Sequence, residues 1–366
     1  PLYYLASAPL TGLFGRGPDA ATLVNLLWLA LLIAGVFGIT RRLFPGAAKS
    51  RSGKIDLQLH WPGLAAAALV TLYPAVTVAL RVYGPALAAA GLAALAVWLL
   101  LASDGLQRRG YAIGFGLVLI AGLLTSSIFW AVVLGPLILA AAQALRTPRP
   151  GRGSRRGPSR HALERFGRRL RLAPAHLNLL GVLLLALVGL ALSLPAQKLP
   201  TFGLAGNLSS ALGLFASSPT ALRVGELSLL LALSIGALYA LWQVIRPRRA
   251  DARPAFGLLL AWLGLGLILL ALLGNGSASQ WMPLLPAAAI LSVAWLAPTE
   301  LPARLNADVP RARVLSRLAA GAAALLLLVA TITTVILTWT SAPSTQSPRP
   351  PPPPPTPPPP PPPPPP

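Results

Sequence analysis

The sequence lacks cysteine and is poor in charged residues. With no cysteine among its 366 residues, it forms neither disulfides nor thiolate metal sites and has no Cys nucleophile. Charged residues make up 10% of the chain and apolar residues 55%, whereas a soluble domain carries about 25% charged residues. Together with a mean hydropathy of +0.69, this composition excludes an ordinary soluble protein and indicates a polytopic membrane protein.

Acidic residues are the scarcest charged groups. None of the 8 Asp and Glu residues lies at the centre of an apolar stretch. Proton-coupled pumps and ion-driven transporters usually bury ionisable groups in the membrane, so this absence argues against that class. The 3 histidines share no metal-ligand spacing within one stretch, so no metal or haem site is predicted.

Ten apolar stretches are each close to the length that a helix needs to cross about 30 Å of hydrocarbon. Only helices satisfy their own backbone hydrogen bonds in lipid, and no strand-like alternation occurs. The sequence therefore predicts an all-α, polytopic transmembrane helical bundle of about ten spans within residues 1–340. We divide the nearly unbroken stretch 111–145 at residues 125–127, because one long helix there would invert every later loop. The ten predicted spans are 21–39, 61–80, 84–102, 111–126, 128–145, 177–195, 225–245, 255–273, 281–297 and 317–339.

Basic residues alternate between the two sides of this arrangement. With the N-terminus outside, the inside loops hold 25 of the 30 Lys and Arg residues, ten of them in the loop 146–176. The largest outside loop is 196–224. This asymmetry follows the positive-inside rule and predicts that both ends of the chain are extracytoplasmic. The net charge of +22 is therefore assigned to topology, and no nucleic-acid partner is expected.

The C-terminal segment 341–366 is rich in Ser, Thr and Pro and then almost pure proline. Such a run forms an extended polyproline II rod without a core, so a disordered tail is predicted. The alanine-rich runs 65–68 and 87–90 permit either close helix packing or a groove for a lipid tail.

Cations on the outer side are the candidates for contact with a lipid phosphate. Arg81 lies in a tight hairpin between two apolar stretches, where a guanidinium can hold a phosphate through two hydrogen bonds. The alternative is an interfacial arginine that only marks the hairpin. Lys198 and Arg223 come next, from the large outer loop. Glu226 either orients Arg223 or faces a sugar, unless the two form a simple interfacial ion pair.

Several short elements, in order, resemble the multi-span GT-C glycosyltransferases of the protein mannosyltransferase and aminoarabinose transferase type. The resemblance covers most of residues 1–300. Its elements are PLYY at residues 1–4, RRLF at 41–44, a span and outer turn with Pro74, Arg81 and Tyr83, LLT at 123–125, Pro136, and GNGSASQWMPLLPAAAILSVAWLA from residue 274.

The resemblance implies a membrane enzyme, a hexosyl- or pentosyltransferase of a prokaryotic plasma membrane. Its donor substrate would be a polyprenyl-phosphate-linked sugar, used at the extracytoplasmic face, and its partners would be membrane lipid and that lipid-linked sugar. Tyr3, Tyr4 and Gln280 then become orienting or sugar-facing candidates. The family's catalytic base lies upstream of PLYY, so the base is expected before Pro1 and the chain is expected to be a truncated or diverged member.

Two other interpretations are consistent with the sequence. One is a non-enzymatic membrane protein, such as a transporter, that shares only its hydropathy with the family. The other is a degenerate GT-C scaffold that acts as a binding or assembly subunit.

Overall fold

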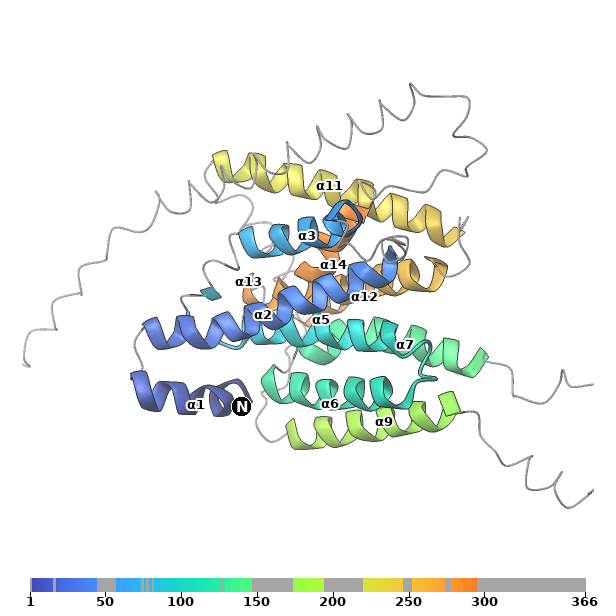
Figure 1. The fold of residues 1–366 in the computed structure, drawn as a ribbon, viewed down its shortest axis with the longest axis horizontal. Helices are drawn as coiled ribbons and strands as arrows, with labels where there is room; N and C mark the ends of the chain where they lie inside the picture. The colour runs from blue at the N-terminus through green and yellow to red at the C-terminus, as the bar shows by residue number, and fades with distance from the viewer. Residues whose placement is uncertain are drawn as a thin grey trace, which may run out of the picture.

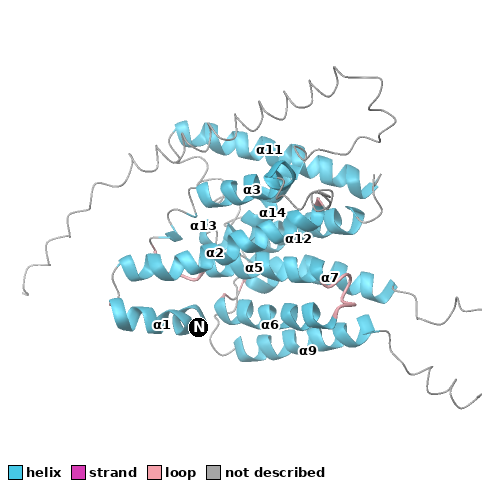
Figure 2. Cartoon of the chain, viewed as in Figure 1, coloured by secondary structure: helices cyan, strands magenta, loops and turns pink. Residues whose placement is uncertain are grey.

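The computed structural model describes residues 2–15, 18–44, 57–73, 76, 79–80, 82–126, 128–146, 174–193, 220–245, 252–273 and 278–294. Every regular element in these ranges is a helix, and the helices lie side by side in a bundle (Figure 1, Figure 2). They are α1 (Leu2–Phe14), α2 (Pro18–Leu43), α3 (Leu57–Leu72), α5 (Ala86–Ala102), α6 (Arg109–Thr125), α7 (Phe129–Arg146), α9 (Pro174–Ser193), α11 (Thr220–Ile245), α12 (Ala252–Leu273), α13 (Ala278–Trp281), the 3₁₀ turn η3 (Met282–Leu284) and α14 (Leu285–Ala294).

Several of these helices have the length and composition of membrane spans. In the described part of the chain, three are long and apolar enough to cross a membrane: Thr22–Leu43, Pro174–Ser193 and Pro254–Leu273. Six shorter apolar helical segments of 10–17 residues accompany them. The chain is thus a helical membrane protein. The number of about ten spans stays a prediction, and the span 317–339 and the tail 341–366 lie outside the described residues.

The division of 111–145 into two helices is confirmed. α6 ends at Thr125, where the backbone of Ser126 becomes extended with φ −145° and ψ 132°. α7 begins at Phe129, and the two helices run in opposite directions (Figure 1). The Thr-Ser-Ser sequence stops the helix because Ser and Thr side chains compete for backbone hydrogen bonds.

Two regions differ from the predicted spans. α1 is a helix for which the hydropathy pattern gave no prediction, and it packs against the start of α2. α3 ends at Leu72, well before the predicted limit at residue 80. The reason is Pro74, because a proline disfavours helical backbone at the residue that precedes it.

α5 lies at the centre of the bundle, in contact with α2, α6, α7, α14 and η3. Of its 17 residues, 12 are buried, most of them alanine. A Cβ on Gly35 of α2 would lie 2.8 Å from the Cβ of Ala94, and one on Gly91 would lie 2.9 Å from the Trp28 carbonyl oxygen. The backbones of α2 and α5 therefore touch almost directly, as small residues allow in membrane helices. Ala88, Ala89 and Ala90 are buried in the same helix, which favours the packing role of the run 87–90.

Gly135 of α7 marks a second close approach, against α12. A Cβ at this position would lie 2.8 Å from the Ala261 carbonyl carbon and nearer still to its oxygen. Gly135→Ala must therefore push the helices apart, and we expect a loss of about 1–3 kcal/mol in the free energy of unfolding, typical of overpacking. Gly264→Ala on α12 is the matched control, since nothing lies within 4 Å of its Cβ. Thermal unfolding in detergent micelles compares the two, and equal midpoints would contradict the close approach.

Candidate functional site

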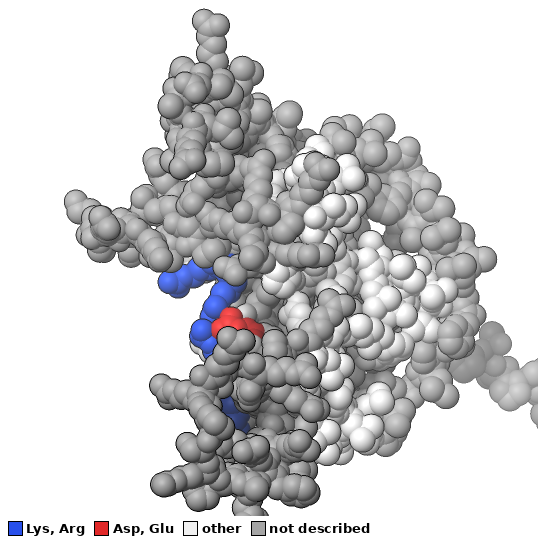
Figure 3. Space-filling view, turned by 90° about the vertical axis from the view of Figure 1, so that its right-hand side faces the viewer, with Lys and Arg blue, Asp and Glu red and all other residues white. Residues whose placement is uncertain are grey.

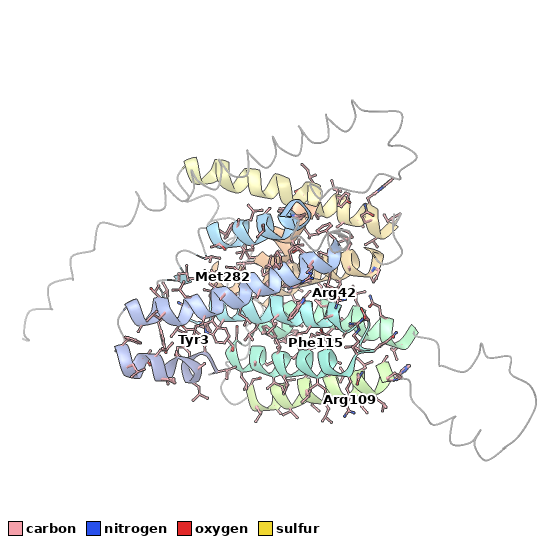
Figure 4. The ribbon with its side chains drawn as sticks, in the orientation of Figure 1. Tyr3, Arg42, Arg109, Phe115 and Met282 are labelled. Carbon is pink, nitrogen blue, oxygen red and sulfur yellow. The ribbon has the colours of Figure 1, made fainter. Side chains whose placement is uncertain are left out.

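Tyr3 is fully buried and joins the PLYY element to α2 (Figure 4). Its phenol O–H donates to Oδ1 of Asn25 at 3.0 Å. α1 lies ahead of the first candidate span, and burial raises the pKa of Tyr3 to about 12, while a hydrogen bond with the Gly84 backbone opposes the shift. The phenol is therefore neutral at physiological pH and acts as a hydrogen-bond donor, not as a base.

Asn25 connects α2 to the turn between α3 and α5. Its Nδ2 donates to the carbonyl oxygens of Ala79 at 2.9 Å, Leu80 at 3.2 Å and Val82 at 2.9 Å. A buried amide is costly on an apolar helix unless it is hydrogen-bonded, and here each polar atom of the side chain has partners. One asparagine thus fixes the backbone on both sides of position 81.

Tyr4 and Tyr83 lie against Tyr3. The ring centroids are 5.3 Å apart for Tyr3 and Tyr4, 5.2 Å for Tyr3 and Tyr83, and 5.6 Å for Tyr4 and Tyr83. Ser7 Oγ and Tyr83 Oη share a hydrogen bond. Tyr4 is 49% exposed and Tyr83 40% exposed, so two amphipathic rings are accessible next to position 81. We call Tyr3, Tyr4, Tyr83, Ser7 and Asn25 the outer tyrosine cluster, after the side on which the charge pattern of the sequence predicts it.

For most of the other predicted site residues, the structure does not describe the side chain. Arg81 and Lys198 lie outside the described residues. Arg223 and Glu226 belong to α11, but their side chains are not among those described. Gln280 is half-buried on α13. Tyr3 and Tyr4 are thus the candidates that the structure shows together.

Two members of the cluster have roles that sequence reasoning missed. From the sequence, Tyr83 is identified only as part of the family resemblance, and Asn25 is not identified as a candidate. The signal for Asn25 is an amide within an apolar span, because such a side chain has to find partners across helices. Its partners are backbone carbonyls, which no residue pattern identifies.

The charged side chains that the structure describes all lie at the other end of the bundle (Figure 3, Figure 4). The outer tyrosine cluster itself contains no carboxylate. No group of three His, Asp or Glu side chains suited to a metal ion occurs in the described ranges. What the cluster offers is uncharged: ring faces, hydroxyl groups and a fixed turn. The charged side chains at the opposite end are Arg41, Arg42, Asp104, Arg108 and Arg109.

Comparison of the chain with protein-family models, with curated proteins and with solved structures finds no match. The GT-C resemblance therefore depends on the sequence elements alone.

The two neighbouring tyrosines of PLYY provide a direct test of the cluster. Tyr3→Phe removes the donor to Asn25 and leaves a buried amide oxygen unpaired, so we expect a loss of about 1–3 kcal/mol in the free energy of unfolding. Tyr4→Phe, at an exposed ring, should change it by less than about 0.5 kcal/mol. Chemical or thermal unfolding of the detergent-solubilised protein measures both. If the two variants are equally stable, the Tyr3–Asn25 hydrogen bond does not hold the elements together.

Proposed function

We propose that the chain is the multi-span part of a GT-C-type glycosyltransferase that uses a polyprenyl-phosphate-linked sugar. The observation that supports this proposal most is that three segments of the family resemblance are hydrogen-bonded to one another. Asn25 of the first span is bonded to Val82 of the outer turn, 57 positions away, and Ser7, just after PLYY, is bonded to Tyr83, 76 positions away. Tyr3 and Asn25 nevertheless join them at one point. A likeness of hydropathy alone gives no reason for these three elements to be hydrogen-bonded to one another.

The chemistry assigns a role to each part of this region. Transfer breaks the bond between the sugar and the phosphate, and negative charge collects on the departing polyprenyl phosphate. A guanidinium at Arg81 stabilises that charge, with Lys198 and Arg223 as further cations. Tyr4 and Tyr83 present ring faces and hydroxyl groups to the sugar, and Glu226 orients Arg223. The base that deprotonates the acceptor comes, by resemblance, from a loop ahead of PLYY.

The described residues favour a transporter less than a glycosyltransferase. The buried polar side chains in the described part of the bundle are all uncharged, which leaves no ionisable relay through the described helices. They are Ser7, Asn25, Thr40, Ser103, Thr125, Ser193, Gln243 and Ser292.

We further propose that the tyrosine cluster faces the extracytoplasmic side and the charged end faces the cytoplasm. The native chain has no cysteine, so single cysteines report sidedness without background. Ser210→Cys in the outer loop should react with a membrane-impermeant maleimide in intact cells. Ser159→Cys in the basic loop should react only after permeabilisation. The reverse pattern would contradict the proposed orientation.

Loss of the Arg81 guanidinium tests the donor site. We expect Arg81→Ala to weaken binding of polyprenyl phosphate about tenfold or more, since a hydrogen bond to a charged group contributes about 1.5–3 kcal/mol. Arg81→Lys should restore only part of the affinity, because an ammonium lacks the bidentate fork. The measurement is titration of the nanodisc-embedded protein with polyprenyl phosphate.

Two controls separate this role from a general one. Polyprenol of the same length should bind weakly to every variant, because it lacks the phosphate. Arg16→Ala removes another outer arginine and should leave phosphate-dependent binding unchanged. If Arg81→Ala binds as tightly as wild type, Arg81 is only an interfacial anchor. If wild type does not distinguish the two lipids, the proposed function is wrong.

A further inference from the structure

The turn between α5 and α6, residues 103–108, has an unusual backbone. Asp104, Gly105 and Leu106 are all left-handed, with φ of 50°, 69° and 66°. Only glycine adopts this region freely, so the two other residues need local support. Ser103 supplies it: its Oγ donates to the Leu100 carbonyl at 2.6 Å and accepts from the Leu106 N–H at 3.1 Å.

Other helices converge on the same turn. Asn178 of α9 donates from Nδ2 to the Leu106 carbonyl at 2.7 Å. The Gln143 side chain of α7 lies beside Gly105, since a Cβ there would be 4.0 Å from its Oε1. Arg42, one residue before the end of α2, approaches Asp104 with 3.9 Å between Nη1 and Oδ1. The turn is therefore a rigid platform that several elements hold in place.

Asp104 orients the guanidinium groups around it. Arg108 donates from Nε to Oδ2 of Asp104 at 2.7 Å, and its terminal NH₂ groups form no ion pair with another side chain among the described residues. The side chains remain accessible, at 39% for Arg42, 45% for Asp104 and 55% for Arg108. Arg41 and Arg109 are exposed and have no ion-pair partner in the described ranges. Two arginines pair with Asp104 and their chain neighbours Arg41 and Arg109 are also exposed, so positive charge outweighs negative charge at this end (Figure 3).

We propose that this arginine cluster, made of Arg42 and Arg108 at Asp104 and their chain neighbours Arg41 and Arg109, binds the phosphate of an anionic phospholipid. The cluster lies at the ends of apolar helices, where lipid headgroups lie, and a basic site between helices suits such a headgroup. Exposed guanidinium forks hold phosphate bidentately. The site is independent of the polyprenyl-phosphate donor, which belongs to the opposite end of the bundle.

α6 also provides a surface for the acyl chain. Ile113 and Leu117 follow Arg109 at intervals of four, so the three side chains share one face of the helix. Ile113 is 45% exposed and Leu117 56% exposed. A lipid with its phosphate at Arg109 can therefore extend its tail along this face. Free phosphate lacks that second contact, which is why a lipid is the expected occupant.

Native mass spectrometry of the detergent-purified chain tests the site. Phosphatidylglycerol and phosphatidylcholine with identical acyl chains are added at equal concentration, and the bound adducts are compared. Wild type should retain phosphatidylglycerol preferentially, and Arg108→Gln with Arg109→Gln should lower that preference at least about fivefold, as expected for loss of surface arginines. Millimolar inorganic phosphate should not displace the lipid.

The matched control removes the same charge from the sequence segment that links α7 to α9. Arg155→Gln with Arg156→Gln, in the loop 146–176, should leave the preference close to that of wild type. An equal loss in both double variants would show a general basic field and overturn the proposal, as would displacement by inorganic phosphate or no lipid preference in wild type.

A charge-conserving pair covers the case in which the Gln variant fails to fold, judged by gel filtration and circular dichroism. Arg108→Lys with Arg109→Lys keeps the charge but loses the forked donors, so its preference should fall severalfold. An unchanged preference would contradict binding by these guanidinium groups.

Discussion

The bundle depends on how closely helices can approach α5. Lipid is as apolar as leucine, so burial of apolar surface gives little drive for membrane helices to associate, and close packing has to supply it. α5 meets this constraint with alanine and glycine where it faces α2, so the backbones of these two helices come into direct contact. With α5 in place, α2 and α6 are fixed on its flanks, and both ends of the bundle are positioned by the same contacts. A larger side chain at Gly91 would separate α2 from α5 and thereby shift the outer turn that follows α3.

The two ends of the bundle use different chemistry for the same structural purpose. At the outer end, Asn25 saturates the carbonyls of a turn with neutral hydrogen bonds. At the other end, Ser103 and Asn178 hold a left-handed turn, and Asp104 adds ionic contacts with arginines. Each turn is thus rigid, yet only one of them carries charge. We therefore expect a charged headgroup to bind at the arginine end. The outer cluster by itself offers aromatic and hydroxyl groups, and only Arg81 would add a charge there.

The sequence predicted the parts of the fold that depend on composition and period. The all-helical class follows from apolar length, and the break between α6 and α7 was placed correctly because three small hydroxyl residues, Thr125, Ser126 and Ser127, interrupt the pattern. The early end of α3 was missed, although Pro74 signals it, because the hydropathy continues past the proline. α1 was missed because only apolar stretches long enough to span a membrane were predicted as helices, whatever their local helix propensity. At the site, Tyr3 was found as a candidate, but its burial and its bond to Asn25 depend on tertiary contacts that have no sequence signature.

The protonation state of Tyr3 limits what the outer cluster can do in a transfer reaction. A general base works best with a pKa near the ambient pH, whereas burial holds the pKa of Tyr3 at about 12. The hydroxyl of Tyr3 is also committed to Asn25, so the phenol serves structure. If the chain takes part in sugar transfer, the proton of the acceptor must go to a carboxylate. The sequence places Glu226 near the large outer loop, with its side chain outside the described part, and the resemblance assigns the base to a loop ahead of PLYY. In each case the cluster fixes the backbone on both sides of position 81 and presents the exposed rings of Tyr4 and Tyr83, and the acid–base step would belong to another segment.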